Sequence, residues 1–211
     1  MVKPLSDPAD IAAVVLAAGN SSRFGSDKLL HPLRLRGETL PLIVHSLMPW
    51  LQTFERTTVV VRPGSEALCD AITTALGPVP REALRWLVCD DAAQGMAASL
   101  ACGVRANRSA AGWLIGLADM PAIPSVAIDG VRDALLFGAD LSASSCYGKC
   151  GHPAGFAACY YEELVALQGD MGARRLLERD KSNLVPIEIR SNGIYIDVDT
   201  PGDLQHLEIR D

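Results

Sequence analysis

Short apolar runs alternate with longer segments of mixed polarity along the first two thirds of the chain. Runs that are apolar on both faces are typical of buried parallel strands, and helix-length segments between them indicate helices that cover the sheet. The predicted strands are residues 11–18, 58–61, 84–88, 113–117 and 141–144, and the predicted helices are residues 41–51, 65–76, 96–108 and 125–137. The pattern predicts an α/β fold, a three-layer α/β/α sandwich around a doubly wound, mostly parallel sheet.

The rhythm changes after Gly151. Further strands are predicted at residues 156–159, 184–189 and 193–198, with helices at 160–167, 172–178 and 201–207. Only Arg190, Ser191 and Asn192 separate the last two strands, and a link this short cannot join parallel neighbours. We therefore expect a small antiparallel excursion there. No linker or internal repeat interrupts the chain, and 211 residues with 49% hydrophobic content suit a single domain over residues 1–211.

The first strand opens into a loop that suits an anion. Residues 14–28 read VVLAAGNSSRFGSDK, so free backbone N–H groups of a small-residue turn lie beside Arg23 and Lys28. A Walker loop is excluded because Lys28 does not follow Gly25 directly, and a dinucleotide fingerprint is excluded because the third glycine is missing. The loop therefore predicts a polyphosphate site of another kind, with an ordinary strand-to-helix turn as the alternative.

The charge and cysteine content limit the classes of partner and ligand that this protein is expected to bind. A net charge of -6 argues against nucleic acid, and no apolar segment is long enough to cross a membrane or to act as an export signal. We expect a cytoplasmic protein that acts on small molecules. The six cysteines are expected to be reduced thiols. Cys146, Cys150 and His152 resemble part of a zinc site, but no second ligand pair lies nearby in the sequence.

Polar segments follow the predicted strands, where open α/β sheets bind their ligands. These segments are LAAGNSSRFGSDK (16–28), QGMAASL (94–100), LADMP (117–121), GHP (151–153), GDMGARRLL (169–177) and DVDTP (197–201). In this order they resemble the MobA-like and MocA-like nucleotidyltransferases of molybdenum-cofactor biosynthesis, over nearly the whole chain. In nucleotidyl transfer, an acceptor oxygen attacks the α-phosphorus of a nucleoside triphosphate and pyrophosphate leaves.

This chemistry needs cations and a metal ion. Arg23 and Lys28 supply the first, with Lys28 expected nearest the α-phosphate, and Asp119 is expected to be a ligand of Mg²⁺. The resemblance supports Asp199 as the second ligand. The expected phosphate-binding residues are Leu16, Ala17, Ala18, Gly19, Ser22, Arg23, Gly25 and Lys28. The alternatives are a solvent-facing Arg23, a surface pair between Lys28 and Asp27, and helix-start roles for Asp119 and Asp199.

The remaining segments are assigned to the nucleoside and the acceptor. Gly95 and Ser99 are expected to contact base and ribose, since glycine permits close approach of a planar ring; a loop before a capped core helix is the alternative. The resemblance places His152, Asp170 and Arg174 beside the second substrate. For His152, a purely structural role remains open.

The resemblance implies a magnesium-dependent cytidylyltransferase that transfers CMP from CTP to the phosphate of molybdopterin or its molybdenum form. Ala18 favours CTP, because GTP users of this superfamily have glycine at the matching place. The alternatives are a GTP-dependent guanylyltransferase of the same pathway, transfer to another phosphorylated small molecule, a non-catalytic cofactor-delivery protein and a Rossmann redox module. A molybdoenzyme or its maturation chaperone is the candidate protein partner.

Overall fold

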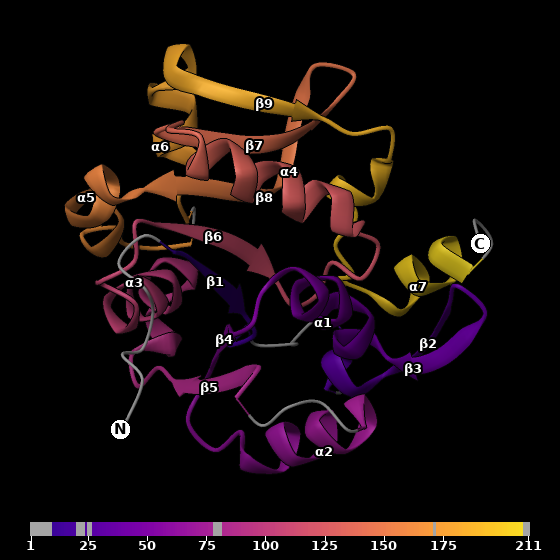
Figure 1. Cartoon of the computed structure of the whole chain (residues 1–211). Coiled ribbons are helices and arrows are strands. Elements are labelled where there is room, and N and C mark those ends of the chain that lie inside the picture. The colour runs from indigo at the N-terminus through magenta and orange to yellow at the C-terminus, as the bar shows by residue number, and fades with distance from the viewer. Residues whose placement is uncertain (1–9, 20–23, 25–26, 78–81, 171, 209–211) are drawn as a thin grey trace.

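The computed structural model describes residues 10–19, 24, 27–77, 82–170 and 172–208. Its centre is a seven-stranded sheet with the order β5-β4-β1-β6-β8-β7-β9 (Figure 1). The strands are β1 (Ile11–Leu16), β4 (Thr57–Val61), β5 (Leu84–Val88), β6 (Gly112–Leu117), β7 (Leu141–Cys146), β8 (Lys149–Ala157) and β9 (Leu184–Glu188). Every strand is parallel to the others except β8, which runs antiparallel to both of its neighbours.

Helices cover both faces of the sheet, as the apolar runs predicted. They are α1 (Leu42–Thr53), α2 (Glu66–Leu76), α3 (Met96–Ala106), α4 (Ser125–Leu136), α5 (Tyr161–Val165), α6 (Arg174–Arg179) and α7 (Pro201–Glu208). Side chains of α1, α2 and α4 form one buried cluster with the sheet, and side chains of α3, α5 and α6 form the other. The three-layer α/β/α sandwich is therefore confirmed. No helix within the described ranges is long and apolar enough to span a membrane.

The antiparallel element lies elsewhere than predicted. It is β8, which begins at Lys149 and pairs with both β6 and β7, whereas residues 192–195 form a 3-10 helix rather than a strand. Tyr147 and Gly148, with φ of 51° and 76°, make the tight turn from β7 into β8. Two consecutive residues at positive φ suit the right-handed twist of a hairpin, so the chain reverses here.

A second hairpin, of β2 (Pro32–Leu35) and β3 (Glu38–Pro41), was not predicted either. It lies outside the main sheet, and α7 lies beside it in Figure 1. The chain between β1 and α1 therefore forms a short two-stranded ribbon in place of the plain loop that the sequence analysis assumed.

The register of β1 and β6 places the main polar loops side by side. Leu16 lies opposite Leu117 at the carboxyl ends of these parallel strands, so the segments that begin at Ala17 and Ala118 leave the sheet together. The backbone N–H of Val198 donates to the carbonyl of Asp119 at 3.0 Å, which joins the C-terminal segment to the same edge. Segments far apart in the sequence thus converge at one end of the sheet.

Candidate active site

A cavity of about 990 Å³ opens at this edge of the sheet. It receives residues from β1, β6, the start of α3, the loop before α6 and the C-terminal segment. The residues on its wall are Leu16, Ala17, Ala18, Gly19, Lys28, Leu29, Arg62, Pro63, Asp90, Ala92, Ala93, Gly95, Met96, Ser99, Leu117, Ala118, Asp119, Asp170, Asp197 and Asp199. The structure therefore brings the described part of the first loop together with the predicted nucleoside residues and both predicted metal ligands.

Lys28 lies at the centre of a polar cluster in this cavity. Its Nζ donates to Asp119 Oδ2 at 2.7 Å and to the Val198 carbonyl at 2.7 Å, and Asp199 Oδ1 lies 3.5 Å away. Lys28 is only 9% exposed, whereas the side chains of Asp119 and Asp199 are 24% and 45% exposed, so the ammonium is buried and the Asp199 side of the cluster faces the solvent. The alternative pairing with Asp27 does not occur, because Asp27 Oδ1 accepts from the N–H of Leu29 and caps the 3-10 helix Lys28–Leu30.

The two aspartates have the chemistry of magnesium ligands. Asp119 Oδ1 is buried and has no hydrogen-bond partner among the described residues, which leaves one carboxylate oxygen for a ligand. Asp119 is not a helix cap, since α4 begins only at Ser125. At the start of α7 the capping role falls to Asp203, which accepts from the N–H groups of Asp199 and Thr200 at 3.0 and 2.7 Å.

A metal ion held here would need ligands from the substrate as well. The described residues contain no group of three or more histidine, cysteine or acidic side chains placed to hold an ion. Magnesium is typically bound by one or two protein carboxylates, with phosphate oxygens and water completing an octahedral shell. Asp119 and Asp199 fit this mode, in which a nucleoside triphosphate provides the other ligands.

The nucleoside end of the cavity is formed by the start of α3 and the loop before α6. Ser99 is buried in the first turn of α3, and Gly95 precedes the helix with φ of 113°. Gly95 lies directly against Gly169 and Asp170, and the N–H of Ala97 donates to the Gly169 carbonyl at 3.0 Å. Asp170, assigned to the acceptor from sequence, therefore lies beside the predicted nucleoside segment.

His152 does not line the cavity but lies behind its wall. Burial holds the pKa of His152 below its ordinary value, although the negative charges of Asp119 and Asp197 and a hydrogen bond with the Ile115 backbone oppose this shift. Its Nδ1 is buried and finds no partner within the described ranges. The neutral ring thus keeps one nitrogen for a hydrogen bond close to the carboxylate cluster.

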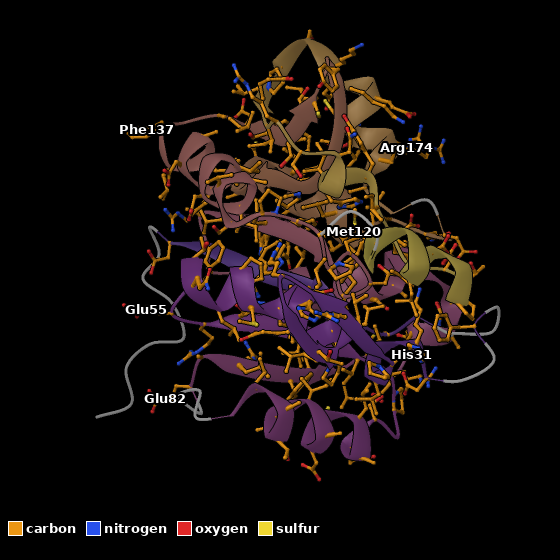
Figure 2. The ribbon with its side chains drawn as sticks, turned by 90° about the vertical axis from the view of Figure 1, so that its right-hand side faces the viewer. His31, Glu55, Glu82, Met120, Phe137 and Arg174 are labelled. Carbon is orange, nitrogen blue, oxygen red and sulfur yellow. The ribbon has the colours of Figure 1, made fainter. Side chains whose placement is uncertain are left out.

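Arg174, predicted to lie beside the second substrate, lies on the surface of α6 and outside the cavity wall. Its side chain is 77% exposed and pairs with Glu178 one turn along α6, with Nε and Oε1 2.7 Å apart. Figure 2 shows Arg174 at the edge of the molecule with its side chain directed outward. Its place four residues before Glu178 explains this pairing on the helix surface. Ser22, Arg23 and Gly25 lie outside the described residues.

The possible zinc ligands do not form a site. Cys146 is buried with its Sγ directed to Asn192 Oδ1 at 3.6 Å, whereas Cys150 is exposed on β8. All six cysteines are free thiols. Several cavity residues had no role predicted from the sequence, among them Arg62, Asp90 and Asp197. Asp90 and Asp197 each follow an apolar stretch, and Asp197 begins the DVDTP segment, so their position in the sequence was the available signal.

A sandwich of this topology, with a lysine held between carboxylates beyond the ends of its central strands, is suited to binding a nucleotide. The chain belongs to the MobA-like NTP transferase domain family, whose model matches residues 13–184.

Among its relatives, the purine catabolism protein PucB of Bacillus subtilis (strain 168) is 32% identical over 197 residues, covering 90% of this chain and 92% of PucB. The crystal structure of Rv0371c from Mycobacterium tuberculosis H37Rv matches with a TM-score of 0.79 and 25% identity over 95% of this chain and 97% of that one. A further structure of Rv0371c is a complex with manganese, with a TM-score of 0.76 and 22% identity over 96% of this chain and 100% of that one. Molybdopterin-guanine dinucleotide biosynthesis protein A from Archaeoglobus fulgidus shares the fold, with a TM-score of 0.65 and 18% identity over 95% of this chain and 98% of that one.

Proposed function

We propose that this protein transfers CMP from CTP to the phosphate of a molybdopterin-type acceptor, with magnesium and with release of pyrophosphate. The observation that carries the proposal is the position of Lys28, whose ammonium lies between Asp119 and Asp199 in a cavity beside the loop that follows β1. A polyphosphate is stabilised by a cation and a divalent ion by convergent carboxylates, and this cluster provides both.

Each residue of the cluster has a distinct task in this proposal. Lys28 neutralises negative charge that develops between the α-phosphate and the leaving pyrophosphate, where a compact point charge is most effective. Asp119 and Asp199 would hold magnesium, and the ion would supply further charge neutralisation to the phosphates. Arg23, which the sequence places in the same loop, contributes a second cation to the departing phosphates.

The choice of CTP rests on the residues around the nucleoside end. Ala18 lies on the cavity wall, where its methyl group reduces the room for a purine, and Gly95 and Ser99 border the same space. One methyl group discriminates by only about 1–3 kcal/mol, so GTP is the competing substrate. The manganese complex of Rv0371c supports a divalent ion in a family member of the same fold.

A phosphorylated acceptor is the simpler choice for this site. A phosphate monoester is mostly dianionic near neutral pH, its second pKa being about 6, so it attacks without a general base. His152 does not line the cavity, and its buried Nδ1 lies behind the wall, so any part it takes in positioning this substrate is through the residues of that wall. The A. fulgidus neighbour carries molybdopterin-guanine dinucleotide biosynthesis in its name, which supports a molybdopterin-type compound, whereas the name of PucB refers to purine catabolism.

The proposal is tested by measuring pyrophosphate release with each of the four common nucleoside triphosphates, with and without molybdopterin. We expect release that requires magnesium, molybdopterin and CTP, with a molybdopterin cytosine dinucleotide as the product found by mass spectrometry. Preference for GTP would change the assigned base and keep the reaction. Release that ignores molybdopterin but responds to another phosphorylated compound would reassign the acceptor, and no release with any pair of substrates would refute catalysis.

A further inference from the structure

The ammonium of Lys28 occupies the place between Asp119 and Asp199 where the proposed metal ion would bind. We propose that Lys28 keeps divalent ions off Asp119 and Asp199 until a nucleoside triphosphate draws its side chain away. This inference rests on the proposed function, and it assigns Lys28 a second task that precedes chemistry. The metal and the nucleotide would then bind together rather than independently.

The contacts of Lys28 satisfy its ammonium group fully. An ammonium has three N–H donors, and three oxygens surround Nζ: Asp119 Oδ2, the Val198 carbonyl and Asp199 Oδ1. Carboxylate and carbonyl oxygens are also what magnesium and manganese prefer. Since the lysine is 9% exposed, a divalent ion that enters the cluster while Lys28 stays would add positive charge beside a poorly screened cation. The two cations therefore compete for the same oxygens.

Release of Lys28 requires only its side chain to move. Its backbone is fixed by the 3-10 helix that Asp27 caps, and the N–H of His31 donates to the Lys28 carbonyl at 3.2 Å. The four-carbon stem is flexible, and Ala17, Ala18 and Gly19 share the cavity with it. A triphosphate bound at that loop offers Lys28 a stronger anion than the two aspartates, which then become available to the ion that the phosphates bring.

Binding of the two ligands must then be reciprocal. If a triphosphate raises the affinity for the metal, the metal raises the affinity for the triphosphate by the same factor, because both cycles connect the same states. Part of this coupling arises from direct contact between phosphate and metal. The remainder of the coupling free energy comes from displacing Lys28 from the two aspartates. A variant without the lysine charge lacks this second contribution, so comparison with the wild type measures it.

The test is a titration of the protein with Mn²⁺ alone, followed by electron paramagnetic resonance of the free ion. We expect Lys28→Met to bind Mn²⁺ roughly tenfold more tightly than the wild type, within the usual range of couplings between sites. Lys28→Arg keeps the charge and should bind Mn²⁺ as weakly as the wild type. Lys181→Met removes an exposed lysine outside the cavity, so it controls for net charge and should leave Mn²⁺ affinity unchanged.

A second substitution assigns the bound ion to this cluster. In the Lys28→Met background, Asp119→Asn should abolish the gain in Mn²⁺ affinity; a gain that persists would place the ion elsewhere and overturn the proposal. Equal Mn²⁺ affinity of Lys28→Met and wild type would overturn it as well. If Lys28→Met fails to fold in thermal unfolding, Lys28→Gln serves in its place, since its amide still donates a hydrogen bond without carrying charge.

Failure of this inference is distinguishable from failure of the proposed function, because the titration contains no nucleotide and no acceptor. Tighter Mn²⁺ binding by Lys28→Met without pyrophosphate release by the wild type would refute the reaction and keep the competition. A nucleotide analogue adds the complementary measurement: a non-hydrolysable CTP analogue should raise Mn²⁺ affinity by a larger factor in the wild type than in Lys28→Met. An equal factor in the two proteins would contradict the release of Lys28.

Discussion

Substituting Gly95 by alanine should disturb the contact between the start of α3 and the loop before α6 at the nucleoside end of the cavity. Gly95 has φ of 113° and ψ of 179°, a backbone conformation that is almost confined to glycine. A Cβ at this position would lie 2.4 Å from Asp170 Oδ1 and 2.9 Å from the Gly169 carbonyl. The Asp170 side chain can turn away, but the Gly169 backbone must shift.

The size of the effect follows from these two causes. A residue other than glycine in this backbone region costs about 1–3 kcal/mol. Crowding against the Gly169 backbone adds about 1–3 kcal/mol, as for other overpacked sites. Gly77 provides the matched control, because its φ of 70° and ψ of −148° lie in the same region, while an added Cβ would meet nothing within 4 Å. Gly77→Ala should therefore incur the backbone cost alone.

Thermal unfolding measures the loss of stability, and nucleotide kinetics measure the effect on CTP binding. For a chain of this length, 1 kcal/mol corresponds to about 2–4 °C, so the Tm of Gly95→Ala should fall ~2–12 °C further than that of Gly77→Ala. Gly95→Ala should also raise KM for CTP roughly tenfold, because Asp170 is displaced at the nucleoside end, whereas Gly77→Ala should not. The reasoning is refuted if both variants lose the same Tm and bind CTP alike.

Asp119→Asn should keep the fold and lose most pyrophosphate release, because an amide binds magnesium weakly. Asp129→Asn, which changes a surface ion pair on α4, is its control. Near-normal release by Asp119→Asn would remove Asp119 from the metal site. His152→Ala should impair use of the phosphorylated acceptor with CTP binding intact, and equal loss of both would assign His152 to the nucleotide or to the core. Burial lowers the pKa of His152 below 6.5, so the unfolded chain takes up the proton first. Stability should therefore fall as pH drops below about 6.5, and His152→Asn should flatten the pH dependence of Tm. Metal analysis should find no stoichiometric zinc; one zinc per chain, lost on changing Cys146 and Cys150, would contradict this.

The sheet and its main helices were predictable because each depends on a local apolar pattern. The two hairpins were not, because their turns, Arg36-Gly37 and Tyr147-Gly148, lack the Asn or Asp that usually precedes glycine in such turns. Arg36 and Tyr147 adopt positive φ only because the strands on both sides pair. Because the Tyr147-Gly148 turn was not predicted, the antiparallel strand was assigned to residues 193–198.

The edge of the sheet that holds the site was predictable for a topological reason, since residues after parallel strands gather at one end. The partners of Lys28 were not, because they lie 91 and 171 residues away along the chain. The direction of the Arg174 side chain was not predictable either, because a motif gives no information on which way a helix faces. On α6 its nearest available anion is Glu178, so it pairs along its own helix.

The hydrogen bond between the N–H of Val198 and the carbonyl of Asp119 joins two segments that the ribosome synthesises at different times. Asp119 is synthesised with β6, but Asp199 emerges about 80 residues later, or roughly 4–16 s at ordinary rates of translation. Until then the nascent chain has its phosphate loop and half of its carboxylate pair, and Lys28 lacks the Val198 carbonyl that positions it. A chain interrupted before this segment can form most of the sheet, but its carboxylate cluster stays incomplete because the Val198 carbonyl and Asp199 are missing.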